Sequence, residues 1–195
     1  GTGRPYFRSA RVLIDFNDLV EARKLIDKGL EIDPDSLTGQ FLLLKTLSGD
    51  EIKSRINDFS IFKDKMPEAQ EEIAQKLMQI DPELGLDFLD FNNPKHFLLI
   101  SKCFFEMEKF PDSLSFANKY INSNPREIEG FLNGGLISIR MENFDEASNF
   151  FDMALGIDKK SPDAIYGKGL ALKKKGKEYG CYQRILSQID KELVI

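Results

Sequence analysis

The chain has 195 residues, of which 42% are hydrophobic and 30% are charged, and its formal net charge is −5. A chain of this length can form one large domain or two small ones and can bury a core without cross-links. Its acidic balance argues against a nucleic-acid binder, and no apolar run reaches the roughly 18 residues that a membrane span needs. We therefore expect no nucleic-acid partner, no membrane partner and a cytoplasmic location.

Few residues in the sequence suit catalysis or metal binding. Cys103 and Cys181 are far apart and both fall on apolar helix faces, so we expect small packed side chains rather than a disulfide framework or a metal site. The single histidine, His96, has no obvious partner and is expected to be an exposed or half-buried helix residue. No glycine-rich phosphate loop or catalytic motif is visible. We expect a protein that is not an enzyme and that holds no cofactor and no metal ion.

The first 93 residues predict helices separated by capping residues. Asp18 followed by Glu21 resembles a capping box at a helix start. Gly49 is expected to stop one helix and Asp50 to cap the next, and Pro67 suits a first helical turn. The expected helices are 4–15, 19–31, 37–47, 51–62, 67–80 and 83–91.

The residues that predict helix starts and turns recur at regular intervals from residue 93 onward. Three times, a side chain that can cap a helix stands before a proline, which loses nothing in the first turn because its missing N–H would be unpaired there anyway. Including the first 93 residues, we expect twelve helices in six hairpins that start near residues 3, 37, 64, 94, 128 and 162. The capping pairs are Asn93-Pro94, Asn124-Pro125 and Ser161-Pro162, and the turns within hairpins are Glu108-Lys109, Glu142-Asn143 and Gly176-Lys177.

A period of 34 residues relates three units, 94–127, 128–161 and 162–195. Small residues recur at the eighth and twentieth places, where they let the two helices of a hairpin approach, and bulky residues at the fourth and twenty-fourth places fill the gap to neighbouring hairpins. No such hairpin buries its apolar face alone, so the hairpins must stack. The small residues are Ser101, Gly135 and Gly169 at the eighth place and Ser113, Ala147 and Cys181 at the twentieth.

This layout resembles the tetratricopeptide repeat family. The segments F131LNGGLIS138 and A147SNFFDMA154 follow the two helical signatures of that family, although the chain lacks Trp, has Gly134 in place of Leu and has Lys159 where proline is usual. The resemblance is good over 94–195, fair over 3–36 and weak over 37–93, where we expect irregular repeats. It implies a single all-α domain over 1–195, a right-handed α-α superhelix of stacked hairpins with about twelve helices.

The resemblance also implies a binding face. In the family, the first helix of each hairpin lines a concave groove in which peptides lie. Some members hold C-terminal carboxylates of chaperone peptides with Lys, Asn and Arg, but in the regular units only Asn133 matches that set, so we do not predict such a clamp there. In the first unit the face carries Arg4, Phe7, Arg8 and Arg11. The partner-binding residues predicted in the regular units are Leu98, Lys102, Phe105, Leu132, Asn133, Leu136, Arg140, Tyr166, Leu170 and Lys174.

The apolar members of this face are too many for an ordinary exposed surface. Three interpretations stay open: they bind an apolar or amphipathic peptide, they are covered by a second copy or by a missing remainder of the chain, or they are core because the face is misplaced by one residue. We expect a non-enzymatic protein–protein interaction scaffold that binds a peptide or helix, with a homo-oligomer possible. The alternatives are a regulatory or substrate-docking domain excised from a larger enzyme, and a self-association module.

Overall fold

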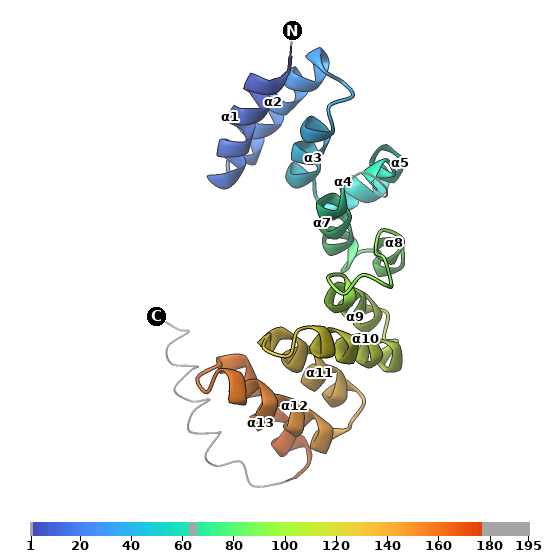
Figure 1. The fold of residues 1–195 in the computed structure, drawn as a ribbon, viewed down its shortest axis with the longest axis vertical. Coiled ribbons are helices and arrows are strands. Elements are labelled where there is room, and N and C mark those ends of the chain that lie inside the picture. Colours follow the sequence, from blue (N-terminus) through green and yellow to red (C-terminus); the bar gives the residue numbers. More distant parts are fainter. Residues whose placement is uncertain (1, 63–65, 177–195) are drawn as a thin grey trace. The chain divides into compact units, whose positions relative to one another are not determined.

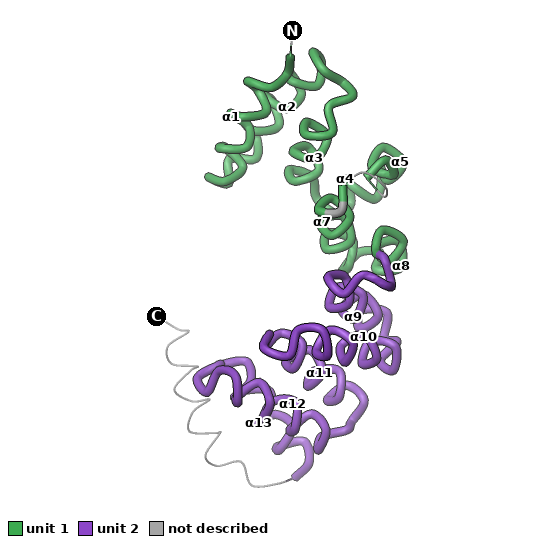
Figure 2. The backbone as a smooth tube through the Cα atoms, viewed as in Figure 1, with its two compact units in different colours: residues 1–89 green, residues 90–195 purple. Residues whose placement is uncertain are grey.

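The computed structural model describes residues 2–62 and 66–176, which form helices joined by short turns (Figure 1). The chain divides into two compact units, residues 1–89 and 90–195 (Figure 2). Twelve helices and no strands occur within the described residues, which confirms the predicted all-α class. The last helix of the expected sixth hairpin lies outside the described residues, and the single domain over 1–195 stays a prediction.

The first unit begins with a helical hairpin, α1 (Arg4–Asp15) and α2 (Leu19–Ile32), and α3 (Leu37–Thr46) packs against both helices. Phe7 is 4% exposed and lies where the three helices meet. A methyl group on Gly3, Gly29 or Gly39 would collide with its ring, so the chain needs glycine at these close approaches. Ala10, at the eighth place of the repeat that starts at Gly3, is fully buried, in keeping with the small-residue pattern.

The remaining helices of the first unit are short. The expected helix 51–62 is broken at Arg55 into α4 (Gly49–Ser54) and α5 (Ile56–Phe59). Two further helices, α7 (Pro67–Leu77) and α8 (Pro82–Leu86), follow. In this described part of the chain, α3 packs mainly on α1, α2 and α7, and α4 packs mainly on α7, so α3 and α4 do not pair as the expected hairpin would require.

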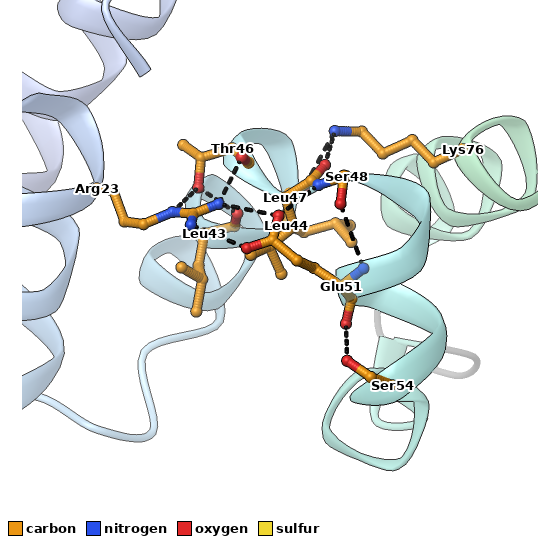
Figure 3. Close-up of polar contacts among 9 residues, drawn as sticks. All are labelled: Arg23, Leu43, Leu44, Thr46, Leu47, Ser48, Glu51, Ser54 and Lys76. Carbon is orange, nitrogen blue, oxygen red and sulfur yellow. Dashed lines mark hydrogen bonds and ion pairs between the residues drawn. The ribbon is translucent and has the colours of Figure 1, made fainter. Parts of the chain in front are cut away.

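The turn between α3 and α4 also differs from the expected one. Gly49 does not stop a helix but begins α4, and the cap is Ser48 rather than Asp50. The Ser48 hydroxyl accepts a hydrogen bond from the Glu51 N–H, and the Glu51 carboxylate accepts one from the Ser48 N–H at 2.8 Å (Figure 3). Such a capping box satisfies two backbone donors at once, which favours a cap two residues before the predicted one.

Two cations hold the end of α3 (Figure 3). Arg23, on α2, donates to the carbonyl oxygen of Thr46 at 2.7 Å and to the Glu51 carboxylate at 3.0 Å. Lys76, on α7, donates to three carbonyl oxygens at the C-terminal end of α3, at 3.3, 3.0 and 2.7 Å. Hydrogen bonds from Arg23 and from the Ser48 backbone lower the pKa of Glu51 to about 2. The carbonyl groups that bind Lys76 belong to Leu44, Lys45 and Leu47.

The second unit is regular. Successive helices pack on one another along the chain, and α11 also contacts the first helices of the hairpins before and after it. This is the arrangement of stacked helical hairpins that the 34-residue period predicts (Figure 1). Its described helices are α9 (Phe97–Glu106), α10 (Phe110–Ser123), α11 (Ile128–Arg140), α12 (Phe144–Ile157) and α13 (Pro162–Lys174).

The hairpin turns repeat the period in the backbone itself. Residues with positive φ stand at the fifteenth place of the repeats that start at residues 3, 94, 128 and 162, where the chain reverses direction between two helices. After Asn17, Glu108 and Glu142, the N–H of the next residue closes the turn onto the carbonyl five residues earlier, as from Asn143 to Ser138 at 2.8 Å, which is the Schellman arrangement. The positive-φ residues are Asn17 (60°), Glu108 (57°), Glu142 (62°) and Gly176 (74°).

The structure confirms the predicted helix caps of the second unit only in part. Ser161 caps α13, since its hydroxyl accepts a hydrogen bond from the Ala164 N–H. Asn93 does not cap a helix, because its side chain closes a turn ahead of α9. Asn124 ends α10 instead of starting α11: its amide donates to the Tyr120 carbonyl at 3.2 Å. The prolines that follow these two asparagines therefore lie in turns.

Candidate functional site

One buried ring, Phe151 of α12, organises the centre of the second unit. It is 1% exposed, and a methyl group on Gly135 of α11 or on Gly167 of α13 would collide with it. Ala147 and Ala171 are fully buried in the same cluster. The small residues let α11 and α13 close over the ring, and the ring becomes part of the lining of a pocket between these two helices.

This pocket has a volume of about 190 Å³. Leu132 and Leu136 of α11 line it with Tyr166 and Leu170 of α13, and each pair is four residues apart, which places both members on one face of their helix. Leu136 is 48% exposed and Tyr166 is 56% exposed, so these two are not core residues. The volume is below the roughly 300 Å³ at which small-molecule pockets begin, and it suits a protruding side chain better.

Four of the ten residues predicted for partner binding therefore meet in one place. The other six do not line the pocket. Lys102 and Lys174 are exposed, and Leu98 is half-buried. Asn133 is only 8% exposed, and its amide donates to the Ser101 hydroxyl at 2.7 Å, so this side chain joins two hairpins of the same chain.

Phe105 and Arg140 form a second small assembly. The Arg140 guanidinium lies 5.3 Å from the ring centre of Phe105 and 5.1 Å from that of Phe110. It also approaches the Glu108 carboxylate at 3.4 Å. The two rings pack edge to face at 5.7 Å. This exposed arginine thus spans two hairpins.

Asp163 and Gly167 line the pocket but were not predicted. Asp163 stands three residues before Tyr166 and seven before Leu170, so helical spacing alone puts it on the same face. It is exposed and adds one carboxylate to an otherwise apolar lining. Gly167 was missed because it was not assigned to one of the recurring places, although it is where α13 approaches Phe151.

Two residues with chemical reactivity, Cys103 and His96, are sequestered, and Cys181 lies outside the described residues. Burial raises the pKa of the Cys103 thiol to about 12, so the thiolate that a nucleophile requires is scarce. His96, expected to be exposed or half-buried, is 1% exposed, and its Nδ1 accepts a hydrogen bond from the Asp90 N–H at 2.8 Å. In the part of the chain that the structure describes, no group of three or more His, Cys, Asp or Glu residues could hold a metal ion, and no helix is long and apolar enough to cross a membrane.

No family model matches the sequence. A 94-residue segment is 28% identical to the peptidyl-prolyl cis-trans isomerase PASTICCINO1 of Arabidopsis thaliana and covers 47% of this chain but only 15% of that protein. Among solved structures, MamA is similar with a TM-score of 0.58 at 14% identity, over 95% of this chain and 97% of the other. A tetratricopeptide repeat protein of Parabacteroides merdae gives 0.52 at 20% identity, over 98% of this chain and 66% of that one. With the 34-residue period and the stacked hairpins, these likenesses identify the fold as that of the tetratricopeptide repeat proteins.

Proposed function

We propose that this chain is a non-enzymatic protein–protein interaction scaffold whose pocket between α11 and α13 receives an apolar side chain of a partner peptide or helix. The observation that carries the proposal is the exposure of Leu136 and Tyr166 beside the buried Phe151 ring. Exposed apolar groups rimmed by polar ones usually mark an interaction site. Repeat arrays use the extended surface of their stacked units for binding.

Cations on the first helices of the hairpins favour a particular kind of partner. Lys102, Arg140 and Lys174 are exposed on the first helices of three successive hairpins. An amphipathic helix or an extended segment with one large apolar anchor and acidic flanks would satisfy both the pocket and these cations. The apolar anchor supplies most of the affinity, because surface ion pairs contribute little.

The test is a peptide selection followed by calorimetry. Peptides from a random displayed library are selected on the 195-residue chain, and the affinity of the enriched sequences is measured for the chain and for the Leu136→Ser/Tyr166→Ser variant. We expect the double substitution to weaken binding by about 1–4 kcal/mol, as the loss of anchor contacts does. The matched control is Met153→Ser/Ile157→Ser, which changes two exposed apolar residues of α12 outside the pocket.

Unchanged affinity of the Leu136→Ser/Tyr166→Ser variant, with its helix content intact by circular dichroism, would contradict the proposal. Analytical ultracentrifugation of the chain and of the Leu136→Ser/Tyr166→Ser variant measures their oligomeric states and so tests the self-association alternative. If the chain forms a dimer that this variant loses, the apolar side chain in the pocket comes from a second copy.

The similarity to PASTICCINO1 favours a second candidate function. That protein is named as a peptidyl-prolyl isomerase, and the matched segment is a small part of it. This chain would then be a substrate-docking or regulatory part of an enzyme, with the same pocket in use. The coding sequence on either side of these 195 residues tests this candidate, since it requires an adjoining catalytic domain.

A further inference from the structure

A separate groove lies in the first unit, between α1 and α3. Its volume is about 530 Å³, well above that of the pocket between α11 and α13. Arg4, Arg8 and Arg11 line it from α1. Their spacing puts all three on one face of the helix, over a length of about 10 Å at a rise of 1.5 Å per residue.

These three arginines differ from the other two described arginines of the unit. All three are exposed, and none has a hydrogen-bond or ion-pair partner among residues 2–62 and 66–176. Elsewhere in the unit, Arg23 binds Glu51 at 3.0 Å and Arg55 binds Asp58 at 3.0 Å. Although the net charge of the chain is −5, these three guanidinium groups along one groove have no partner among the described residues. The groove lining adds a single carboxylate, Asp33, so it is strongly basic.

The rest of the lining helps to decide which anionic partner fits. The groove includes Phe7 and Leu42, but they are only 4% and 2% exposed. Sites for single-stranded nucleic acid combine a basic groove with exposed aromatic rings on which bases stack. Phe7 cannot serve in this way, because its ring is enclosed by Gly3, Gly29 and Gly39. The groove offers guanidinium groups and the exposed hydroxyl of Thr38, which suit carboxylates on a peptide.

We propose that the groove between α1 and α3 binds an extended acidic segment of a partner protein through its side-chain carboxylates. Each guanidinium can donate two parallel hydrogen bonds to one carboxylate. Alternate side chains of an extended peptide lie about 6.6 Å apart on one side, while the axial distance is about 6 Å between Arg4 and Arg8 and about 4.5 Å between Arg8 and Arg11, a difference that the long arginine side chains can span. Acidic residues at alternate positions would therefore meet successive arginines. No chain terminus is needed, so the segment can lie inside a longer partner.

The test uses the full 195-residue chain and fluorescence anisotropy. The probe is a labelled peptide of about ten residues with Glu at alternate positions and with both ends blocked, since that length spans the three arginines in extended form. We expect it to bind at low salt, to weaken as salt rises, and to lose affinity when its Glu residues are replaced by Gln. We expect the Arg4→Gln/Arg8→Gln/Arg11→Gln variant to bind it about tenfold more weakly, because three exposed ion pairs are removed.

The matched control is Lys28→Gln/Lys159→Gln/Lys160→Gln, which removes the same charge from three exposed positions outside the groove. Equal loss in the two variants would overturn the proposal, because it would mean diffuse attraction rather than a site. Absence of binding, or binding only when the peptide has a free carboxyl end, would overturn it as well. A single-stranded oligonucleotide that binds more tightly than the peptide through the same arginines would make the groove a nucleic-acid site. The arginine variant leaves the pocket between α11 and α13 unchanged. Binding of the peptides selected for that pocket therefore tests the proposed function independently of this groove.

Discussion

Residues 37–86 and residues 97–176 are both helical, but they end and pair their helices by different means. In the second region the hairpin turns are made by backbone, with positive φ at Glu108, Glu142 and Gly176, and small residues let neighbouring helices approach. In the first region α3 is held by side chains from other helices, namely Arg23 and Lys76. Backbone turns and small residues repeat along a sequence, whereas long-range side-chain contacts occur once. Where the sequence follows the repeat pattern poorly, individual polar contacts between side chains and backbone fix the positions of the helices.

The regular region should be most sensitive at its small residues. Ala147 is fully buried among Ile139, Phe151 and Ala171. We expect Ala147→Arg to destabilise the second unit by at least about 3 kcal/mol, because it forces an unpaired charge and excess volume into a close helix contact. Thermal unfolding followed by circular dichroism measures the effect. Met153→Arg on the same helix, at a position that is 54% exposed, is the control and should leave the transition nearly unchanged.

The irregular region should instead be sensitive at its long cations. We expect Lys76→Met to destabilise the first unit by about 2 kcal/mol, because three carbonyl groups at the end of α3 lose their charged donor. Arg140→Met is the counterpart in the regular region. It removes an exposed pair with Glu108 and the contacts with the rings of Phe105 and Phe110, and should cost about 1 kcal/mol or less. Equal costs in urea denaturation would remove the distinction between the two regions.

A smaller effect tests the backbone turns. Glu142 holds φ at 62°, a conformation that costs an ordinary residue about 1–2 kcal/mol and glycine little. We expect Glu142→Gly to stabilise the chain by about 0.5–1 kcal/mol, after the greater freedom of glycine in the unfolded chain is subtracted. Glu146→Gly, four residues later inside α12, should destabilise by about 1 kcal/mol. A melting temperature that falls in both variants would contradict this account of the turn.

The smallest effect concerns pH in the first unit. The pKa of Glu51 is lowered from 4.5 to about 2, with the hydrogen bond from Arg23 as the largest cause. Because the folded pKa is below the unfolded one, the stabilisation is complete above about pH 4.5 and is lost as the pH falls towards 2. The difference in unfolding free energy between the chain and Glu51→Gln should therefore shrink over that range. An Arg23→Met background should remove most of this pH dependence, and a difference that persists there would assign it to another group.

The sequence predicts the regular region well because its signals are local. The hairpin turns at Glu108 and Glu142 and the close approach at Gly135 follow from residue types at fixed places in the repeat. The turn between α3 and α4 was predicted wrongly, because the serine and glutamate of the capping box compete with the nearby Asp50. The roles of Arg23 and Lys76 carry no local signal, since each reaches carbonyl groups more than twenty residues away.

The candidate site was predicted in part for a related reason. Helical spacing places Leu132, Leu136, Tyr166 and Leu170 on one face, and these four line the pocket. The same spacing does not distinguish adjacent positions well, because consecutive residues are about 100° apart around a helix. Asn133 therefore appeared on the binding face although it is buried against Ser101. Its environment depends on the neighbouring hairpin, which the sequence of one helix does not specify.

The shared ring of Phe151 couples the shape of the pocket to the cohesion of the stack. The same side chain lines the pocket and fills the space left by Gly135 and Gly167. A smaller residue there would enlarge the binding cavity but would also loosen the seam between α11 and α13. Thermodynamic linkage then requires that any occupant resting on this ring raise the melting temperature of the unit. Substitutions that change which side chain the pocket prefers should therefore cost less stability at Leu136 and Tyr166, because these exposed side chains can change without disturbing the contact between α11 and α13.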